Sequence, residues 1–294
     1  MRKEKSRRKK EELPAQFLLS IASVFKQKNW KIMKTENPAE SHFNRFCERM
    51  QDINDEKGRE LLLDLTKRYL WLPQELYFEH LENALEKLLV EYRKITSKSE
   101  IYVMQLIAPK DEKKIKSSAM MLYSFNDMRL RMDARFLHYK FEIVSNKKVL
   151  PKKLEGQDAV VVLVDDYIGT GDTAISCVEA LEKYGIKTEQ MAVLSLVAQE
   201  EGKRKLEKKG VFFCTSILRK RGISDFYVGE ERDKNIKIMH VIESDLKVEQ
   251  KYKFGYGESE ALVTMCRTPN NTFPVFWYEP EQGNEKKYAP FPRF

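Results

Sequence analysis

Residues 159–174 have the sequence AVVVLVDDYIGTGDTA, which joins a hydrophobic run to two carboxylates and a turn rich in glycine and threonine. The run 159–164 contains four valines and no polar alternation, a pattern typical of a strand buried on both faces of a parallel sheet. Residues 174–184 then read as a helix. Because ligands of open α/β sheets collect beyond the carboxyl ends of strands, Asp165 and Asp166 are expected to stand beside a ligand.

The turn that follows the carboxylates has the chemistry of an anion site. Gly169 and Gly171 allow a close backbone approach, while Thr170 and Thr173 supply hydroxyl groups. The start of the next helix adds free N–H groups and a partial positive charge. The stretch therefore predicts a site for a sugar phosphate. The alternative is structural: the carboxylates end a strand and the turn leads into a capped helix.

The pattern Asp165-Asp166-x-x-x-Thr170-Gly171-x-Thr173 resembles the phosphoribosyl pyrophosphate loop of type I phosphoribosyltransferases. The resemblance implies that the two aspartates bind the ribose hydroxyls and that Thr170, Gly171 and Thr173 hold the 5′-phosphate. It also implies phosphoribosyl pyrophosphate or a nucleotide as the ligand, with Mg²⁺ bridging the pyrophosphate of the former. No residue stands out as a general base, so the catalytic residues stay open.

Two residues of this ligand-binding stretch depart from the family pattern. Gly169 occupies a position where some members carry an acidic base, and Asp172 places a negative charge inside a turn meant for phosphate. Both departures favour the alternative function, a nucleotide-sensing or nucleic-acid-binding module that uses the same pocket without turnover.

The rest of the chain predicts an α/β fold with a parallel sheet flanked by helices, preceded by an all-helical region. The resemblance implies that this sheet is type I phosphoribosyltransferase-like. Residues 13–97 form that helical region, with helices at 13–28, 38–50, 60–70 and 73–95. Residues 98–294 form the α/β domain, with its core at 98–218 and a C-terminal hood-like extension. Strands are expected at 101–108, 159–164, 190–198 and 211–217, with helices at 119–132 and 200–208 and a strand or short helix at 136–144. Such alternation gives right-handed crossovers.

Two further groups of residues are predicted to contact the ligand. Lys116 and Ser117 follow the first core strand, where the family carries a pyrophosphate-binding loop, although a Lys-Ser pair before a helix can also be only a cap. Tyr256 lies between two glycines, and Asn270 and Asn271 follow a proline. This second group either contacts a base or ring, or forms an ordinary hairpin turn.

Tyr256-Gly257 and Thr268-Pro269-Asn270-Asn271-Thr272-x-Pro274 sharpen the resemblance. With the earlier motif they resemble the divergent phosphoribosyltransferase-like (PRTase-CE) domain of bacterial conflict systems, over roughly residues 35 to 280. That group includes candidate effectors, or toxins, of phage defence, some of them beside retron reverse transcriptases. The resemblance implies an antiviral effector whose partners would be a reverse transcriptase and its RNA–DNA product. An oligomer is compatible with it.

Charge and composition limit the class of protein. The net charge is +8, and basic residues crowd the tail 1–12: Arg2, Lys3, Lys5, Arg7, Arg8, Lys9 and Lys10. This tail either binds nucleic acid by neutralising phosphates or is simply solvated. No apolar run approaches the ~20 residues of a membrane span, and the N-terminus lacks the apolar core of a signal peptide, so we expect a cytoplasmic protein. Scattered cysteines and histidines predict neither a disulfide framework nor a metal site built by protein alone.

Overall fold

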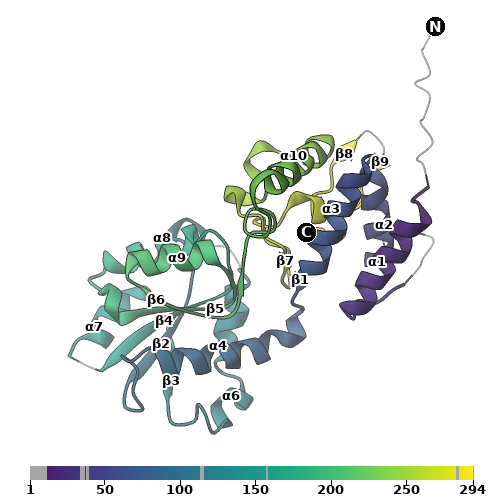
Figure 1. Ribbon diagram of the computed structural model, residues 1–294. Helices are drawn as coiled ribbons and strands as arrows, with labels where there is room; N and C mark the ends of the chain where they lie inside the picture. Colours follow the sequence, from purple (N-terminus) through teal and green to yellow (C-terminus); the bar gives the residue numbers. More distant parts are fainter. Residues whose placement is uncertain are drawn as a thin grey trace. The chain divides into compact units, whose positions relative to one another are not determined.

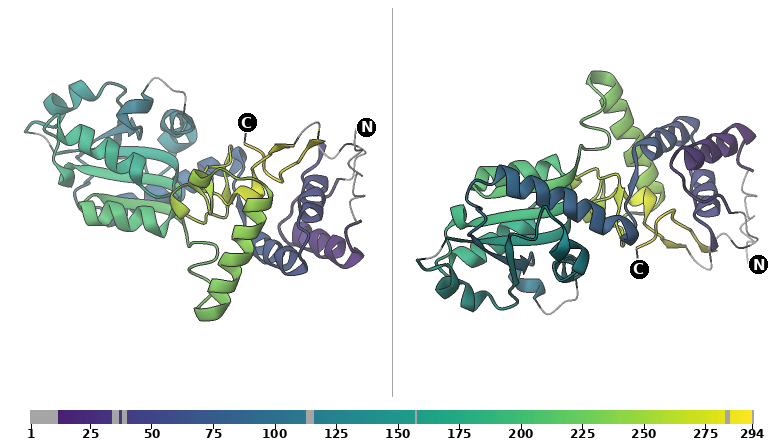
Figure 2. Two further views of the ribbon diagram at one scale, coloured as in Figure 1. Left: turned by 90° about the horizontal axis from the view of Figure 1, so that it is seen from above. Right: turned by 90° about the horizontal axis from the view of Figure 1, so that it is seen from below.

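The computed structural model describes residues 12–33, 37, 40–112, 116–156, 158–282 and 285–293. The chain forms two compact units, Met1–Leu70 with Gly222–Phe294, and Trp71–Arg221 (Figures 1 and 2). We call them unit 1 and unit 2. The expected domain boundary at residue 97 stays a prediction; the compact units divide the chain elsewhere. Except for Glu12, the basic tail lies outside the described residues, so its role also stays a prediction.

Unit 2 is built on a five-stranded sheet in the order β3-β2-β4-β5-β6, and every neighbouring pair is parallel. Its strands are β2 (Glu100–Gln105), β3 (Lys140–Ile143), β4 (Ala159–Ile168), β5 (Met191–Gln199) and β6 (Phe212–Arg219). β5 is buried at every position, as expected for an interior strand of a sheet covered on both faces. The predicted fold class is therefore confirmed.

The strand order reverses between β2 and β4. From β2 the chain passes to β3 on one side of the sheet, and then returns to place β4 on the other side. In such sheets the crevice for a ligand forms at the carboxyl ends of the two strands that flank the reversal. The segments that leave β2 and β4 are the ones that contain Lys116, Ser117 and the Gly/Thr turn.

Helices cover both faces of this sheet. α4 (Tyr77–Glu91) packs on β5 and β6, and α5 (Ser118–Ser124) packs on β2 and β4. α8 (Asp172–Glu182) and α9 (Glu200–Lys209) pack together, and Figure 1 shows them on the face opposite α4. The remaining helices of the unit are α6 (Met128–Met132) and α7 (Leu150–Leu154).

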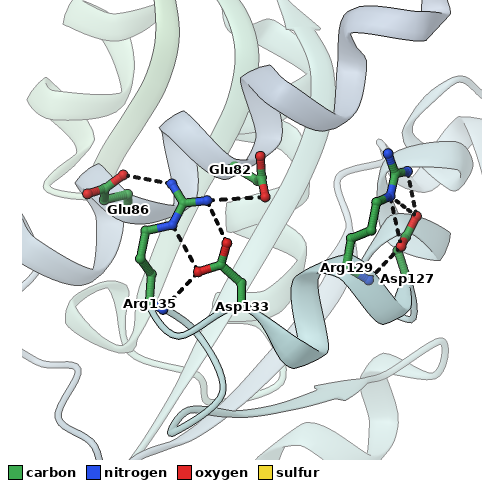
Figure 3. A network of polar contacts seen from close by, with 6 residues as sticks. All are labelled: Glu82, Glu86, Asp127, Arg129, Asp133 and Arg135. Atoms are coloured by element: carbon green, nitrogen blue, oxygen red, sulfur yellow. Dashed lines mark hydrogen bonds and ion pairs between the residues drawn. The ribbon is translucent and has the colours of Figure 1, made fainter.

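One predicted helix of unit 2 is divided. The helix expected at 119–132 is interrupted between α5 and α6, because the Asp127 side chain accepts a hydrogen bond from the Arg129 backbone N–H at 2.9 Å and starts a new helix there. The Asp127 carboxylate also accepts a hydrogen bond from Arg129 Nη2 at 2.7 Å (Figure 3).

Unit 1 joins the N-terminal helices to the C-terminal segment. Its helices are α1 (Ala15–Gln27), α2 (His42–Asp52), α3 (Glu56–Arg68) and α10 (Gly229–Asp245). The buried Phe25 ring contacts Phe43 and Phe46 edge-on at 5.3 and 5.2 Å between centroids. The expectation of a wholly helical N-terminal region was wrong at Leu70, which begins β1 (Leu70–Trp71) because its N–H pairs with the Leu262 carbonyl at 2.9 Å.

The shorter elements complete the description. The C-terminal strands are β7 (Val263–Thr264), which pairs with β1, and the antiparallel pair β8 (Glu281–Gln282) and β9 (Glu285–Lys286). The 3₁₀ turns are Gln74–Leu76, Pro109–Asp111, Lys147–Val149, Thr188–Gln190, Gln250–Tyr252, Tyr256–Glu258 and Pro274–Phe276. Among the described residues, no helix is both long and apolar enough to cross a bilayer.

Candidate functional site

Both aspartates of the central motif lie inside β4 and not beyond it. The strand was expected to end at Val164, but β5 continues alongside it, and β4 keeps pairing as far as Ile168 opposite Ala198. On its other side β2 ends at Gln105, opposite Val164. From residue 165 onward β4 therefore has a strand on one side only, and the loop after β2 and the side chains of flanking helices come close to it.

Asp166 is held by two hydroxyl groups from distant parts of unit 2. The Tyr77 hydroxyl at the start of α4 donates to Oδ2 at 3.0 Å, and Ser117 Oγ, just before α5, donates to Oδ1 at 2.6 Å. Only 5% of Asp166 is exposed. Its two carboxylate oxygens thus already accept the kind of hydrogen bond that a pair of sugar hydroxyls would donate.

Asp165 is half-buried and accepts a hydrogen bond from the backbone N–H of Asp166 at 2.9 Å. Burial raises the pKa of the Asp165 carboxyl well above its ordinary value, and the neighbouring Asp166 charge raises it further. The positive charge of Lys116 opposes this rise in the pKa of Asp165. The Lys116 Nζ itself forms an ion pair with Asp111 Oδ2 at 3.0 Å. The structure therefore joins Ser117 to Asp166 by a hydrogen bond, while the ligand role expected for Lys116 and Ser117 stays a prediction.

The turn 169–171 connects β4 to α8 through a left-handed residue. Gly171 has φ of +82° and caps α8, a conformation that residues with a Cβ rarely adopt. Thr170 Oγ1 donates to Asp172 Oδ2 at 3.0 Å, and Asp172 also forms an ion pair with Lys205 of α9. The Lys205 ammonium donates a hydrogen bond within this ion pair, and that bond lowers the pKa of the Asp172 carboxyl. Thr173 is exposed in the first turn of α8.

α9 presses directly on this turn through a glycine. A Cβ on Gly202 would lie 2.5 Å from the Gly169 carbonyl oxygen and 2.8 Å from Ile168 Cγ2. A Cβ on Gly171 would in turn lie 3.1 Å from Gly202 Cα. The backbones of the turn and of α9 are therefore in contact, and no side chain fits between them. This contact fixes the position of the turn relative to the sheet.

The late cluster of predicted ligand residues lies in unit 1 and is bonded to itself. The Asn271 side-chain amide donates to the Tyr256 carbonyl and to Ser259 Oγ, both at 3.2 Å, and the Tyr256 N–H donates to the Asn270 carbonyl at 2.8 Å. A Cβ on Gly255 would lie 1.9 Å from the Asn271 carbonyl oxygen. These contacts explain Gly255 and the Asn271 amide as parts of a tight turn, and leave the 42% exposed Tyr256 at its surface.

The comparisons with known proteins bear on this arrangement. The family model described as PRTase-CE matches residues 43–293. The chain belongs to the PRTase-CE family. This confirms the family assignment made from the motif. No curated protein matches the chain significantly in sequence.

Two solved structures are similar to part of this PRTase-CE chain. One is APRTase from Giardia lamblia complexed with 9-deazaadenine, with 18% identity, a TM-score of 0.29, and coverage of 47% of this chain and 79% of that one. The other is the AQ2163 protein from Aquifex aeolicus, with 15% identity, a TM-score of 0.31, and coverage of 68% of this chain and 90% of that one.

Three residues of the candidate site were not predicted from the sequence. Gly202 carried a usable signal, because a glycine inside a strongly charged helix costs about 1 kcal/mol and usually has a packing reason. Lys205 lies one turn further along the same helix but is one of many exposed lysines. Tyr77 gave no signal, since it reaches Asp166 from 89 residues away in the chain.

Proposed function

We propose that unit 2 binds the ribose 5-phosphate group of phosphoribosyl pyrophosphate or of a nucleotide, and acts at C1′ of that sugar. The observation that carries the proposal is the left-handed Gly171 at the start of α8, in the turn that follows the strand of the two aspartates, where the strand order reverses. The free N–H groups of α8 suit a phosphate. Asp165 and Asp166 suit the sugar hydroxyls on the same end of β4.

The chemistry at C1′ requires charge to be controlled on both sides of the breaking bond. As the bond breaks, the sugar ring develops oxocarbenium character, which the carboxylates of Asp165 and Asp166 would stabilise electrostatically. A leaving pyrophosphate would need a cation, and Lys116 follows β2 directly before Ser117, whose hydroxyl donates to Asp166. In that role the Lys116 ammonium would leave its ion pair with Asp111 and bind the pyrophosphate instead.

The donor set also suits Mg²⁺ brought in with the ligand. Mg²⁺ is commonly held by one or two carboxylates together with substrate phosphates. Half-buried Asp165 is the residue that would hold it, since both oxygens of Asp166 are hydrogen-bonded to hydroxyl groups. When bound, the ion would neutralise the charge of the pyrophosphate. Among the described residues, no group of three or more acidic, histidine or cysteine side chains is arranged to hold a metal without a ligand.

A second candidate function is a sensing module that binds the nucleotide without turnover. The observation that favours it is the hydroxyl pair on Asp166, because Tyr77 and Ser117 satisfy the carboxylate that a substrate ribose would need. The negative charge of Asp172 within the turn acts in the same direction.

Calorimetric titration of the full chain with ribose 5-phosphate and with phosphoribosyl pyrophosphate, with and without Mg²⁺, tests the binding step. Thr173→Val and Asp166→Asn should each weaken binding, whereas Thr188→Val, which removes a hydroxyl bonded to Glu182 outside the site, should not. Unchanged binding in both site variants contradicts the proposal. Chromatography of the products after incubation with a nucleotide panel separates the two candidates, because only the enzyme releases free base or pyrophosphate.

We also propose that this activity serves antiviral defence in a bacterial host, beside a reverse transcriptase and its RNA–DNA product. Family membership supports this setting. In a plaque assay, cells that express the wild-type chain with its neighbouring genes should resist phage, and Asp166→Asn should abolish resistance at equal protein levels. Deleting residues 1–12 should reduce the salt dependence of nucleic-acid binding by roughly 0.9 per lost phosphate contact. An unchanged slope contradicts a role for the tail.

A further inference from the structure

A hollow of unit 2 lies at the carboxyl ends of β2 and β3. The second half of α8 forms one wall, and the segment 144–148 that follows β3 forms another. Its volume is about 330 Å³, at the lower end of the range of about 300–1,000 Å³ that is usual for small-molecule sites. Neither the two aspartates of β4 nor any residue of the turn 169–171 lines it, so the hollow is separate from the candidate site.

The floor of the hollow is apolar. Met104 of β2, Val144 and Leu181 of α8 belong to the hydrophobic core of the unit and also border this space. Cys177 and Ala180, one turn apart on α8, line it as well and are both small. Ala180 is half-buried and ends at its Cβ, so a longer side chain there would take up part of the space. The floor therefore favours a hydrocarbon group and offers nothing to an ion.

The rim of the hollow carries hydrogen-bond donors that lack acceptors. Lys148 is exposed, and within the described part of the chain neither its ammonium nor the Ser145 hydroxyl has a partner. The Asn146 carboxamide oxygen accepts from the Lys148 backbone N–H at 3.0 Å, which leaves the amide N–H groups of Asn146 to donate. The Lys147 ammonium, by contrast, is already held in an ion pair with Glu112. Lys148 is therefore the cation that a ligand would meet.

The floor and the rim together select a ligand with an apolar body and one negative charge. Two lysines and one glutamate line the hollow, so its net charge is positive. A bare phosphate or pyrophosphate would leave the apolar floor uncovered, and an uncharged hydrocarbon would leave the donors unpaired. A carboxylate accepts from an ammonium and a hydroxyl at the same time, and such charge-assisted hydrogen bonds are stronger than those between neutral groups.

From these features we propose that the hollow binds a short aliphatic monocarboxylate. Its chain would lie over Met104, Val144 and Leu181, and its carboxylate would accept from Lys148 and Ser145. The ligand would contact α8, the helix that begins directly after Gly171, but would not touch the turn itself. The inference therefore does not rest on the proposed function, and either can fail without the other.

An NMR-detected titration of the full chain with propionate, butyrate and hexanoate tests the apolar floor. The affinity should rise about fourfold for each methylene group that becomes buried. Ala180→Leu fills part of the space and should weaken hexanoate binding by at least about fourfold, the loss of one buried methylene. The matched control is Ala22→Leu, which enlarges a half-buried alanine of α1 in unit 1 and should leave hexanoate binding unchanged.

The charged end of the ligand is tested by Lys148→Gln. The variant should bind hexanoate about threefold more weakly, as expected for one ion pair at a partly exposed position. It should bind hexan-1-ol, which has the same chain without the charge, as the wild type does. Lys152→Gln makes the same change of charge at an exposed lysine that does not line the hollow. Because Lys148 is exposed, its variant should keep the thermal unfolding midpoint within about 2 °C of the wild type.

Competition separates this inference from the proposed function. Hexanoate should bind Asp166→Asn and the wild type alike, and neither ribose 5-phosphate nor pyrophosphate should displace it. If ribose 5-phosphate does not bind at all while hexanoate does, the proposed function fails and the hollow stands. The inference is overturned if hexanoate does not bind, if pyrophosphate displaces it, if affinity does not depend on chain length, or if Lys148→Gln and Lys152→Gln weaken binding equally.

Discussion

Lys205 on α9 forms an ion pair with Asp172, the first residue of α8, and this pair lies across the turn that would hold the phosphate. Thr170 donates to the same carboxylate at 3.0 Å. Asp172 therefore engages both a cation and a hydroxyl that a bound phosphate would otherwise attract. Asp172, which departs from the family pattern in the sequence, is thus paired with Lys205 in the structure.

Asp172→Asn should strengthen the binding of ribose 5-phosphate. The change frees Lys205 and removes a negative charge near the phosphate, a repulsion worth about 1 kcal/mol at ~4 Å in water, or roughly fivefold in affinity. Calorimetry at low and high salt measures it, and the gain should shrink as salt screens the charge. Glu207→Gln is the control, because it frees Lys203 on the same helix without touching the turn. Weaker binding by Asp172→Asn would contradict this role.

Gly202→Ala should destabilise unit 2 and weaken sugar-phosphate binding. In an ordinary helix interior the change stabilises by up to about 1 kcal/mol. Here the new methyl group would meet the Gly169 carbonyl oxygen at 2.5 Å, and overpacking of this kind costs about 1–3 kcal/mol. Urea unfolding gives the sign directly. Lys203→Ala, at the next position of α9, serves as the comparison. A stabilised Gly202→Ala protein would show that the turn moves away from the new methyl group at little cost in free energy.

Tyr77→Phe and Ser117→Ala each remove one hydrogen-bond donor from Asp166, and we expect the first to change stability and the second to change ribose affinity. Loss of the Tyr77 hydroxyl leaves a buried carboxylate oxygen without its donor, which should lower the free energy of unfolding by about 1–3 kcal/mol. Ser117 is exposed, so its loss should cost little stability and should leave Oδ1 ready for a ribose hydroxyl. Ribose affinity should rise in Ser117→Ala. If the affinity falls instead, Ser117 is itself a ligand contact.

Asp165→Asn should stabilise the protein, and more so at neutral than at acid pH. Burial and the Asp166 charge raise the pKa of Asp165, so the folded state keeps its proton after the unfolded state has lost it. Wild-type stability is therefore highest below the unfolded pKa of about 3.9 and falls as the pH rises through the folded pKa. Asparagine does not ionise, so the variant does not lose this stability as the pH rises.

Urea midpoints of wild type and Asp165→Asn at pH 4.5 and 7.5 measure the effect. Asp245→Asn, an exposed aspartate of α10, provides the baseline. A constant difference between the two proteins across this range would mean that the Asp165 carboxyl has an ordinary pKa in the folded state.

Local sequence determined the parts of this protein whose contacts lie close together in the chain. The valine run 159–164 predicted an interior strand, and the glycines and threonines at 169–173 predicted the turn into a helix, because backbone freedom and burial act within a few residues. Local pattern also gave the alternating order of strands and helices, and hence the parallel sheet. It missed β1, because a two-residue strand exists only through its distant partner.

Tertiary structure alone decided which side chains meet. Nothing in the sequence could place the Tyr77 hydroxyl on Asp166, Gly202 under the turn, or Lys205 on Asp172, since each contact joins residues 30 or more positions apart through the packing of α4 and α9 on the sheet. The length of β4 was likewise set by β5 beside it. Residue type fixes what a side chain can bond, but sheet order and helix packing determine what lies within its reach.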